Sequence, residues 1–110
     1  MNKVLFFTYD GKSPFKKWLL AQDPMTAARI RNTLARMEAG NRGDYKILFP
    51  GLYETRLFFG SGYRIYYTVQ NGQLIIILGA GNKKTQTKDI ALAKKYLSML
   101  QEGRPYDKKK

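Results

Sequence analysis

The sequence contains no cysteine and no histidine. Without cysteine the chain can form neither disulfides nor thiolate metal sites, and without histidine it lacks the usual zinc ligand and the usual general base. We therefore expect no metal ion and no cofactor. No apolar run approaches the roughly 18 residues of a membrane span, and the short apolar run near the N-terminus lacks the cleavage site of a signal peptide. These absences predict a cytoplasmic protein with no membrane partner.

Acidic residues are also scarce. Eight Asp and Glu stand against 20 Lys and Arg, so the 110 residues carry a net charge of +12. Self-repulsion of this size slightly destabilises a small domain, and a polyanionic partner is the simplest explanation for it. The hydrophobic fraction of 44% and the aromatic fraction of 14% are those of a folded protein. We expect a single domain over residues 1–103, followed by a basic tail over residues 104–110.

The local signals predict an α+β fold in the order β-α-α-β-β-β-β-α, with helices packed on a mainly antiparallel sheet. A strand is expected over residues 3–9. Two helices should then begin at Ser13-Pro14 and Asp23-Pro24, because each pair combines an N-cap residue with proline at the first helical position. The segment 45–49 fits a short edge strand or a loop.

Three strands joined by tight turns are expected between residues 52 and 78. Asn71-Gly72 is a strong signal for a type I′ hairpin turn. Residues 74–78 are continuously apolar, which indicates a central strand covered on both faces. A last helix should begin at Thr85 or Thr87, with Asp89 in its first turn. Gly103 is expected to end this helix.

The functional prediction comes from the alternation of side chains along these strands. Glu54 and Arg56 should share one face of their strand, with Arg64 and Tyr66 beside them on the next. Lys83 and Lys84 follow the third strand. We therefore predict a cationic cluster at one end of the sheet, with RNA as its target, formed by Arg56, Arg64, Lys83 and Lys84. On the second helix, Arg29, Arg31 and Arg36 are better explained as a solvated face than as RNA contacts.

Several fragments in order resemble the RelE/ParE toxin superfamily, and more narrowly its HigB-like "addiction module killer protein" branch. They are Glu54-x-Arg56, Gly62-Tyr63-Arg64, and Gly81-x-Lys83, followed by Gln86 and by Asp89-Ile90-x-x-Ala93-Lys94. The resemblance runs from the helix that contains Phe15–Leu19 to Leu97. Each fragment is weak alone, and their common order and spacing are what carry the similarity.

The resemblance implies the toxin of a type II toxin–antitoxin system, neutralised by a helix-turn-helix antitoxin. Most RelE-like toxins cut messenger RNA on the ribosome, whereas ParE-like toxins poison DNA gyrase. The basic positions of the family match Arg64, Arg56, and Lys83 or Lys84. We expect Gln86, Arg64 and Tyr66 to bind RNA. The ring of Tyr66 could stack on a base.

Cleavage of RNA by its own 2′-hydroxyl requires proton transfer and stabilisation of charge on the phosphate. Arg56 and Arg64 suit the phosphate, because a guanidinium offers paired donors and stays charged. Without histidine, the candidates for the base are Glu54, Asp89, Lys83 and Lys84. Glu54 could equally form an ion pair with Arg56 or Lys83 that only orients them. We predict a metal-independent, ribosome-dependent mRNA endoribonuclease. A gyrase poison and a non-catalytic nucleic-acid-binding protein are the alternatives.

Overall fold

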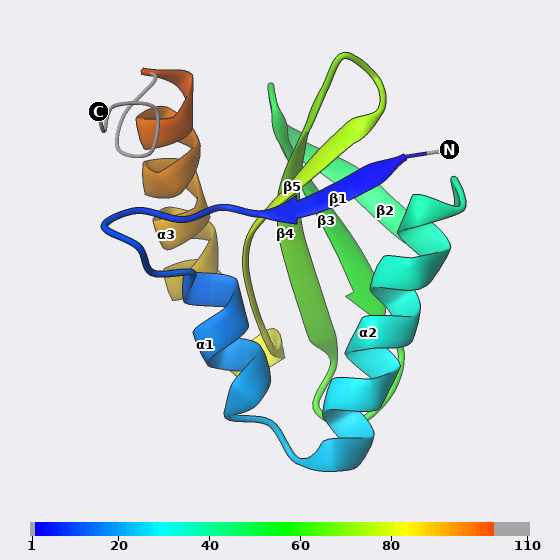
Figure 1. Ribbon diagram of the computed structural model, residues 1–110. Helices are drawn as coiled ribbons and strands as arrows, with labels where there is room; N and C mark the ends of the chain where they lie inside the picture. The colour runs from blue at the N-terminus through cyan, green and yellow to red at the C-terminus, as the bar shows by residue number, and fades with distance from the viewer. Residues whose placement is uncertain (1, 103–110) are drawn as a thin grey trace.

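A computed structural model describes residues 2–102 as one five-stranded sheet with α-helices on both of its faces (Figure 1). The predicted α+β class and the predicted order of elements are confirmed. The basic tail and the expected helix end at Gly103 lie outside the described residues. The elements are β1 (Lys3–Phe6), α1 (Pro14–Leu20), α2 (Pro24–Glu38), β2 (Asp44–Phe49), β3 (Leu52–Leu57), β4 (Tyr63–Gln70), β5 (Leu74–Gly81), the 3₁₀ turn η1 (Lys83–Thr85) and α3 (Gln86–Gln101).

The strands lie in the order β1-β5-β4-β3-β2. Strand β1 runs parallel to β5, and the other neighbours are antiparallel. The apolar strand β5 is therefore internal, as its sequence predicted, and β2 is an edge strand. Because β1 pairs with β5, β1 forms the edge of the sheet opposite β2.

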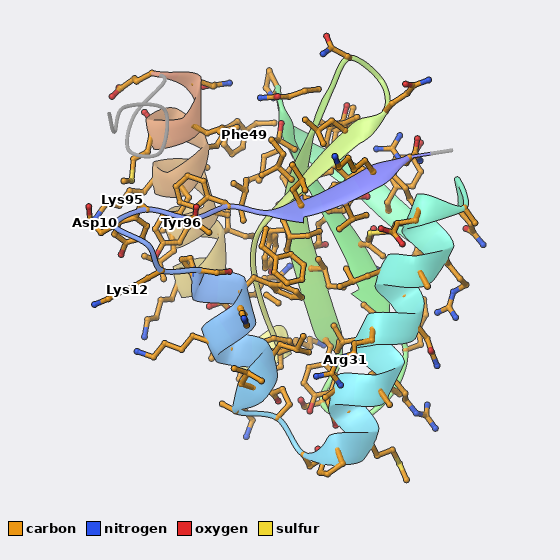
Figure 2. The ribbon with its side chains drawn as sticks, viewed as in Figure 1. Asp10, Lys12, Arg31, Phe49, Lys95 and Tyr96 are labelled. Atoms are coloured by element: carbon orange, nitrogen blue, oxygen red, sulfur yellow. The ribbon has the colours of Figure 1, made fainter. Side chains whose placement is uncertain are left out.

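Two hydrophobic cores fill the two faces of the sheet. Helices α1 and α2 cover one face, where Phe15 and Ile30 pack on Ile65 and Tyr67. Helix α3 covers the other face, where its buried residues pack on Leu52, Tyr66, Ile76 and Leu78. At the edge of this second core, Tyr96 of α3 projects toward the segment after β1 (Figure 2) and stacks on Phe7, with the ring centroids 5.2 Å apart.

The predicted start signals of both early helices are confirmed. The side chain of Ser13 accepts a hydrogen bond from the backbone N–H of Lys16, and that of Asp23 accepts one from Thr26. The Asn71-Gly72 turn has positive φ at both positions, 54° and 70°, as a type I′ turn requires. These elements form where local chemistry alone decides the conformation.

The predicted faces of β3 and β4 are also correct. A bulge interrupts the pairing of β4 with β5 between Tyr66 and Tyr67. Because the extra residue, Leu78, lies on β5, the alternation of β3 and β4 is undisturbed. Arg56, Arg64 and Glu54 therefore come from the face that α3 covers. None of the helices within residues 2–102 combines the length and the apolarity of a membrane span.

Candidate functional site

Glu54 is the centre of a polar group beneath α3. Its side chain is fully buried in the middle of β3. A buried carboxylate is costly unless cations and hydrogen-bond donors surround it. Three side chains do so here. Gln86 Nε2 donates a hydrogen bond of 2.9 Å to Glu54 Oε2, Arg64 Nε lies 3.6 Å from the same oxygen, and Lys46 Nζ lies 4.0 Å from Oε1.

These partners correct one prediction. We considered an ion pair of Glu54 with Arg56 or Lys83, whereas the structure pairs it with Arg64 and Lys46. The reason is strand register. Lys46 is the Cα partner of Glu54 across the β2–β3 pair, and Arg56 turns outward, where its guanidinium Nη2 lies 2.9 Å from Asp44 Oδ2. Lys46 was missed because the sequence left it open whether residues 45–49 form a strand.

Arg64 is held from two sides. Its side chain is only 11% exposed, and besides the contact with Glu54 its Nη1 donates a hydrogen bond of 2.9 Å to the carbonyl of Gly62. Because a guanidinium is planar and always charged, fixing it in this way presets the direction of its donors.

Tyr66 lies on the predicted face but is buried, with no exposed surface. The expected stacking of its ring on a base is wrong for this conformation, because α3 and the second core cover the ring. Burial raises the pKa of its phenol well above the ordinary value, and the carboxylates of Glu54 and Asp89 raise it further. Tyr66 is therefore a neutral hydroxyl next to a carboxylate and a guanidinium. We refer to Glu54, Arg64, Tyr66 and Gln86 as the Glu54 cluster.

Unsatisfied polar atoms concentrate in this cluster. Within residues 2–102, four buried side-chain polar atoms lack a hydrogen-bond partner. Three of them are Glu54 Oε1, Arg64 Nε and Tyr66 Oη. Such atoms are uncommon in folded proteins, so their concentration marks a polar group with capacity for further bonds.

The turn from β5 into α3 brings the lysines to this end of the sheet. Asn82 begins η1, and its Oδ1 accepts hydrogen bonds from the backbone N–H groups of Lys84 (2.9 Å) and Thr85 (3.2 Å). Thr85 or Thr87 was predicted to cap the last helix, and the structure puts Thr85 at the N-cap position. Its side chain makes no capping hydrogen bond, and Asn82 supplies the capping oxygen one turn earlier. Lys83 and Lys84 are both exposed.

Two glycines lie where these segments meet. A Cβ at Gly62 would lie 3.6 Å from Arg64 Nη1 and 3.7 Å from Lys83 Cβ, so Arg64 and Lys83 flank one glycine. A Cβ at Gly81 would collide with the carboxylate of Asp89, which accepts a hydrogen bond from Thr85 Oγ1. Gly81 therefore lets the start of α3 sit directly on the end of β5.

The predicted cationic cluster is thus only partly assembled. Arg64 and Lys83 flank Gly62, and Arg64 contacts the buried Glu54, to which Gln86 donates a hydrogen bond. Arg56 is the Cα partner of Arg64 across the strands, but its side chain pairs with the exposed Asp44 and lies over the ring of Phe58. Lys84 is exposed on η1. The arrangement offers a fixed guanidinium and exposed ammonium groups at one edge, which suits a phosphate.

A comparison with known families bears on this geometry. The family described as "Phage derived protein Gp49-like (DUF891)" matches residues 17–106. The chain belongs to this Gp49-like family. An uncharacterized protein of Haemophilus influenzae is 43% identical over 81 residues, which cover 73% of this chain and 82% of that protein.

The Gp49-like family lies within the RelE/ParE-like toxin superfamily, so the broad resemblance noted from the sequence is confirmed. Membership of the Gp49-like family indicates the toxin of a toxin–antitoxin pair and implies an antitoxin as a partner. The narrower HigB-like assignment stays a prediction.

Proposed function

We propose that this Gp49-like protein is a ribosome-dependent mRNA endoribonuclease that inhibits translation, and that its antitoxin is a helix-turn-helix protein. One observation carries the proposal. Arg64 is fixed by a fully buried carboxylate and lies beside Lys83 at an edge where Lys84 is also exposed. A rigid guanidinium with neighbouring ammonium groups is suited to a phosphate whose negative charge increases in the transition state.

All the bonds to phosphorus that change in this reaction lie within the RNA. The 2′-oxygen attacks the adjacent phosphorus, the bond from phosphorus to the 5′-oxygen breaks, and the products are a 2′,3′-cyclic phosphate and a 5′-hydroxyl. One proton leaves the 2′-hydroxyl and one reaches the 5′-oxygen. In this proposal Arg64 stabilises the phosphate, and Lys83 and Lys84, which are both exposed, exchange protons with the two oxygens.

Glu54 has a positioning role in this proposal, although the sequence made it a candidate base. A carboxylate with no exposed surface cannot touch the 2′-hydroxyl, and both of its sides face cations. The carboxylate of Asp89 accepts a hydrogen bond from Thr85 Oγ1 at the start of α3. Orientation of the message by the ribosome would supply much of the rate, since positioning alone can lower a barrier by ~7–11 kcal/mol.

Cell-free translation of a defined message tests the proposal through Arg64. We expect wild-type protein to cut the message and Arg64→Ala to cut it at least about 100-fold more slowly, as for loss of one oxyanion-stabilising donor. Arg31→Ala is the control, because Arg31 is an exposed arginine of α2, away from the cluster. Equal cutting by the Arg64 variant and the wild type would overturn the proposal.

A further inference from the structure

A second cationic feature lies outside the Glu54 cluster. A groove of about 630 Å³ runs between α2 and the end of β3. Its walls combine cations, amides and aromatic rings, among them Arg29, Asn32, Arg36, Arg56, Phe58 and Phe59. A cavity of this size is large enough for a ligand group of several rings or charges.

The charge of the groove is almost entirely positive. Its one acidic residue, Asp44, is engaged by Arg56, whose Nε donates a hydrogen bond of 3.0 Å to Asp44 Oδ2. Arg29 and Arg36 make no ion pair within residues 2–102. Arg29 instead lies over the ring of Phe59, 4.9 Å from its centroid, and Arg36 donates a hydrogen bond to Thr33 Oγ1. Both guanidinium groups are thus oriented and still without an anion.

The groove also carries an exposed aromatic ring. Phe58 is 78% exposed, the highest value among the large hydrophobic side chains of the described residues. The guanidinium of Arg56 lies 5.3 Å from its ring centroid. Single-stranded nucleic acids bind to such surfaces, where a positive groove follows the phosphates and aromatic side chains stack on bases.

We propose that this groove binds single-stranded RNA next to the cleavage site, with phosphates on Arg29 and Arg36 and a base on Phe58. For these two arginines the proposal replaces the solvated face expected from the sequence, because both line the groove whereas Arg31 does not. The inference rests on the proposed function, because it assigns a path to the same RNA. Arg56 joins the two sites, since it lines the groove and is the Cα partner of Arg64. An acidic protein segment could also use the arginines, but the exposed ring, the amide of Asn32 and the continuity with Arg64 favour RNA.

Binding of a short labelled RNA to the purified protein tests the groove. The probe is an unstructured single strand of about 12 nucleotides with 2′-O-methyl groups, which removes the attacking hydroxyl and prevents cleavage. The variants are Arg29→Ala/Arg36→Ala and Phe58→Ala. Arg31→Ala is the matched control, labelled beside α2 in Figure 2, because it is an exposed arginine of the same helix that does not line the groove.

We expect the double variant to flatten the slope of log affinity against log salt by about 1.4, since each phosphate contact on a single strand contributes about 0.7. Phe58→Ala should weaken binding at least about fivefold, the lower end of the effect of losing one stacked base. Arg31→Ala should leave the slope unchanged. Thermal unfolding of each variant verifies that it is folded.

Two results would overturn the inference. One is a loss of affinity in Arg31→Ala as large as in the double variant, which would mean that net charge alone binds the RNA. The other is that the groove variants bind RNA as well as the wild type does, but no longer bind a poly-glutamate peptide that the wild type binds. That result would assign the groove to an acidic protein segment. Failure of the proposed function is a separate outcome: the wild type would bind the probe through the groove and yet leave a translated message uncut.

Discussion

Glu54 and Asp44 show how the surroundings of a single carboxylate determine its role. Each of the two residues pairs with an arginine on the neighbouring strand. Glu54 is fully buried against Arg64, whereas Asp44 and Arg56 are each nearly half exposed. Water therefore screens the second pair and not the first.

The free energy of unfolding, measured with urea, should separate the two pairs. Glu54→Ala should lower it by about 3–5 kcal/mol, because it leaves Arg64 without its buried counter-charge. Asp44→Ala should lower it by no more than about 1 kcal/mol, as for exposed ion pairs. Equal losses in the two variants would contradict the structural role of Glu54.

Tyr66 gives the protein a pH-dependent contribution to stability. Its pKa is raised in the folded state, mainly by burial and then by Glu54 and Asp89. The folded protein therefore keeps the phenol proton at a pH where the unfolded chain loses it. This contribution is fully present below the ordinary tyrosine pKa of about 10 and is lost as the pH rises toward the folded value.

Urea unfolding of the wild type and of Tyr66→Phe at about pH 9 and pH 11 measures this effect. We expect the wild type to lose more stability than the variant between the two values. Burial also raises the pKa of Tyr67 and of Tyr96, so the variant should keep part of the alkaline loss. An identical pH dependence in both proteins would show that Tyr66 titrates normally.

The sequence predicted which face of the sheet each of these residues occupies, but not whether its side chain is buried. A period of two places Glu54, Arg64 and Tyr66 on one side of the sheet, and the structure agrees. This period does not indicate which helix covers that side of the sheet. Helix α3, more than 30 positions after Glu54, buries Tyr66 and brings Gln86 to the carboxylate. Contacts of this separation depend on topology, and a local pattern does not encode them.

At the scale of elements, the passage from β5 through η1 into α3 decides where Lys83 and Lys84 lie. Gly81 is the tightest point of this passage, because a Cβ there would strike Asp89 and Thr85. Gly79, two residues earlier on the same strand, has open space around its Cβ position. The two glycines therefore form a matched pair.

Gly81→Ala should lower the free energy of unfolding by about 1–3 kcal/mol, the usual cost of overpacking, and should reduce RNA cleavage by displacing η1. Gly79→Ala should change both quantities little. Urea unfolding and a cleavage assay on the same preparations measure the pair. A Gly81 variant as stable and active as the Gly79 variant would show that the close approach has no importance.

Elements fixed by local chemistry were predicted well. The caps at Ser13 and Asp23 and the turn at Asn71-Gly72 follow from side-chain hydrogen bonds and positive φ within four residues. The cap at Asn82 was missed, since Thr85 offered the more familiar signal at the start of the helix. The parallel pairing of β1 with β5 was also missed, because its partners are about 70 residues apart.

At the scale of the whole molecule, part of the positive charge of the described residues gathers on two surfaces. One is the edge with Arg64, Lys83 and Lys84, and the other is the groove with Arg29 and Arg36. Arg56 lies between them. If both surfaces bind the same ligand, as we propose, a strand of RNA could reach them together, whereas a single compact anion could not.

We propose that this toxin-family protein cuts messenger RNA during translation. The most direct measurement maps the 5′ ends of a defined message after incubation with the purified protein, with and without ribosomes in the translation mixture. We expect cuts in phase with the codons that vanish when ribosomes are omitted. An intact message with ribosomes present would contradict it.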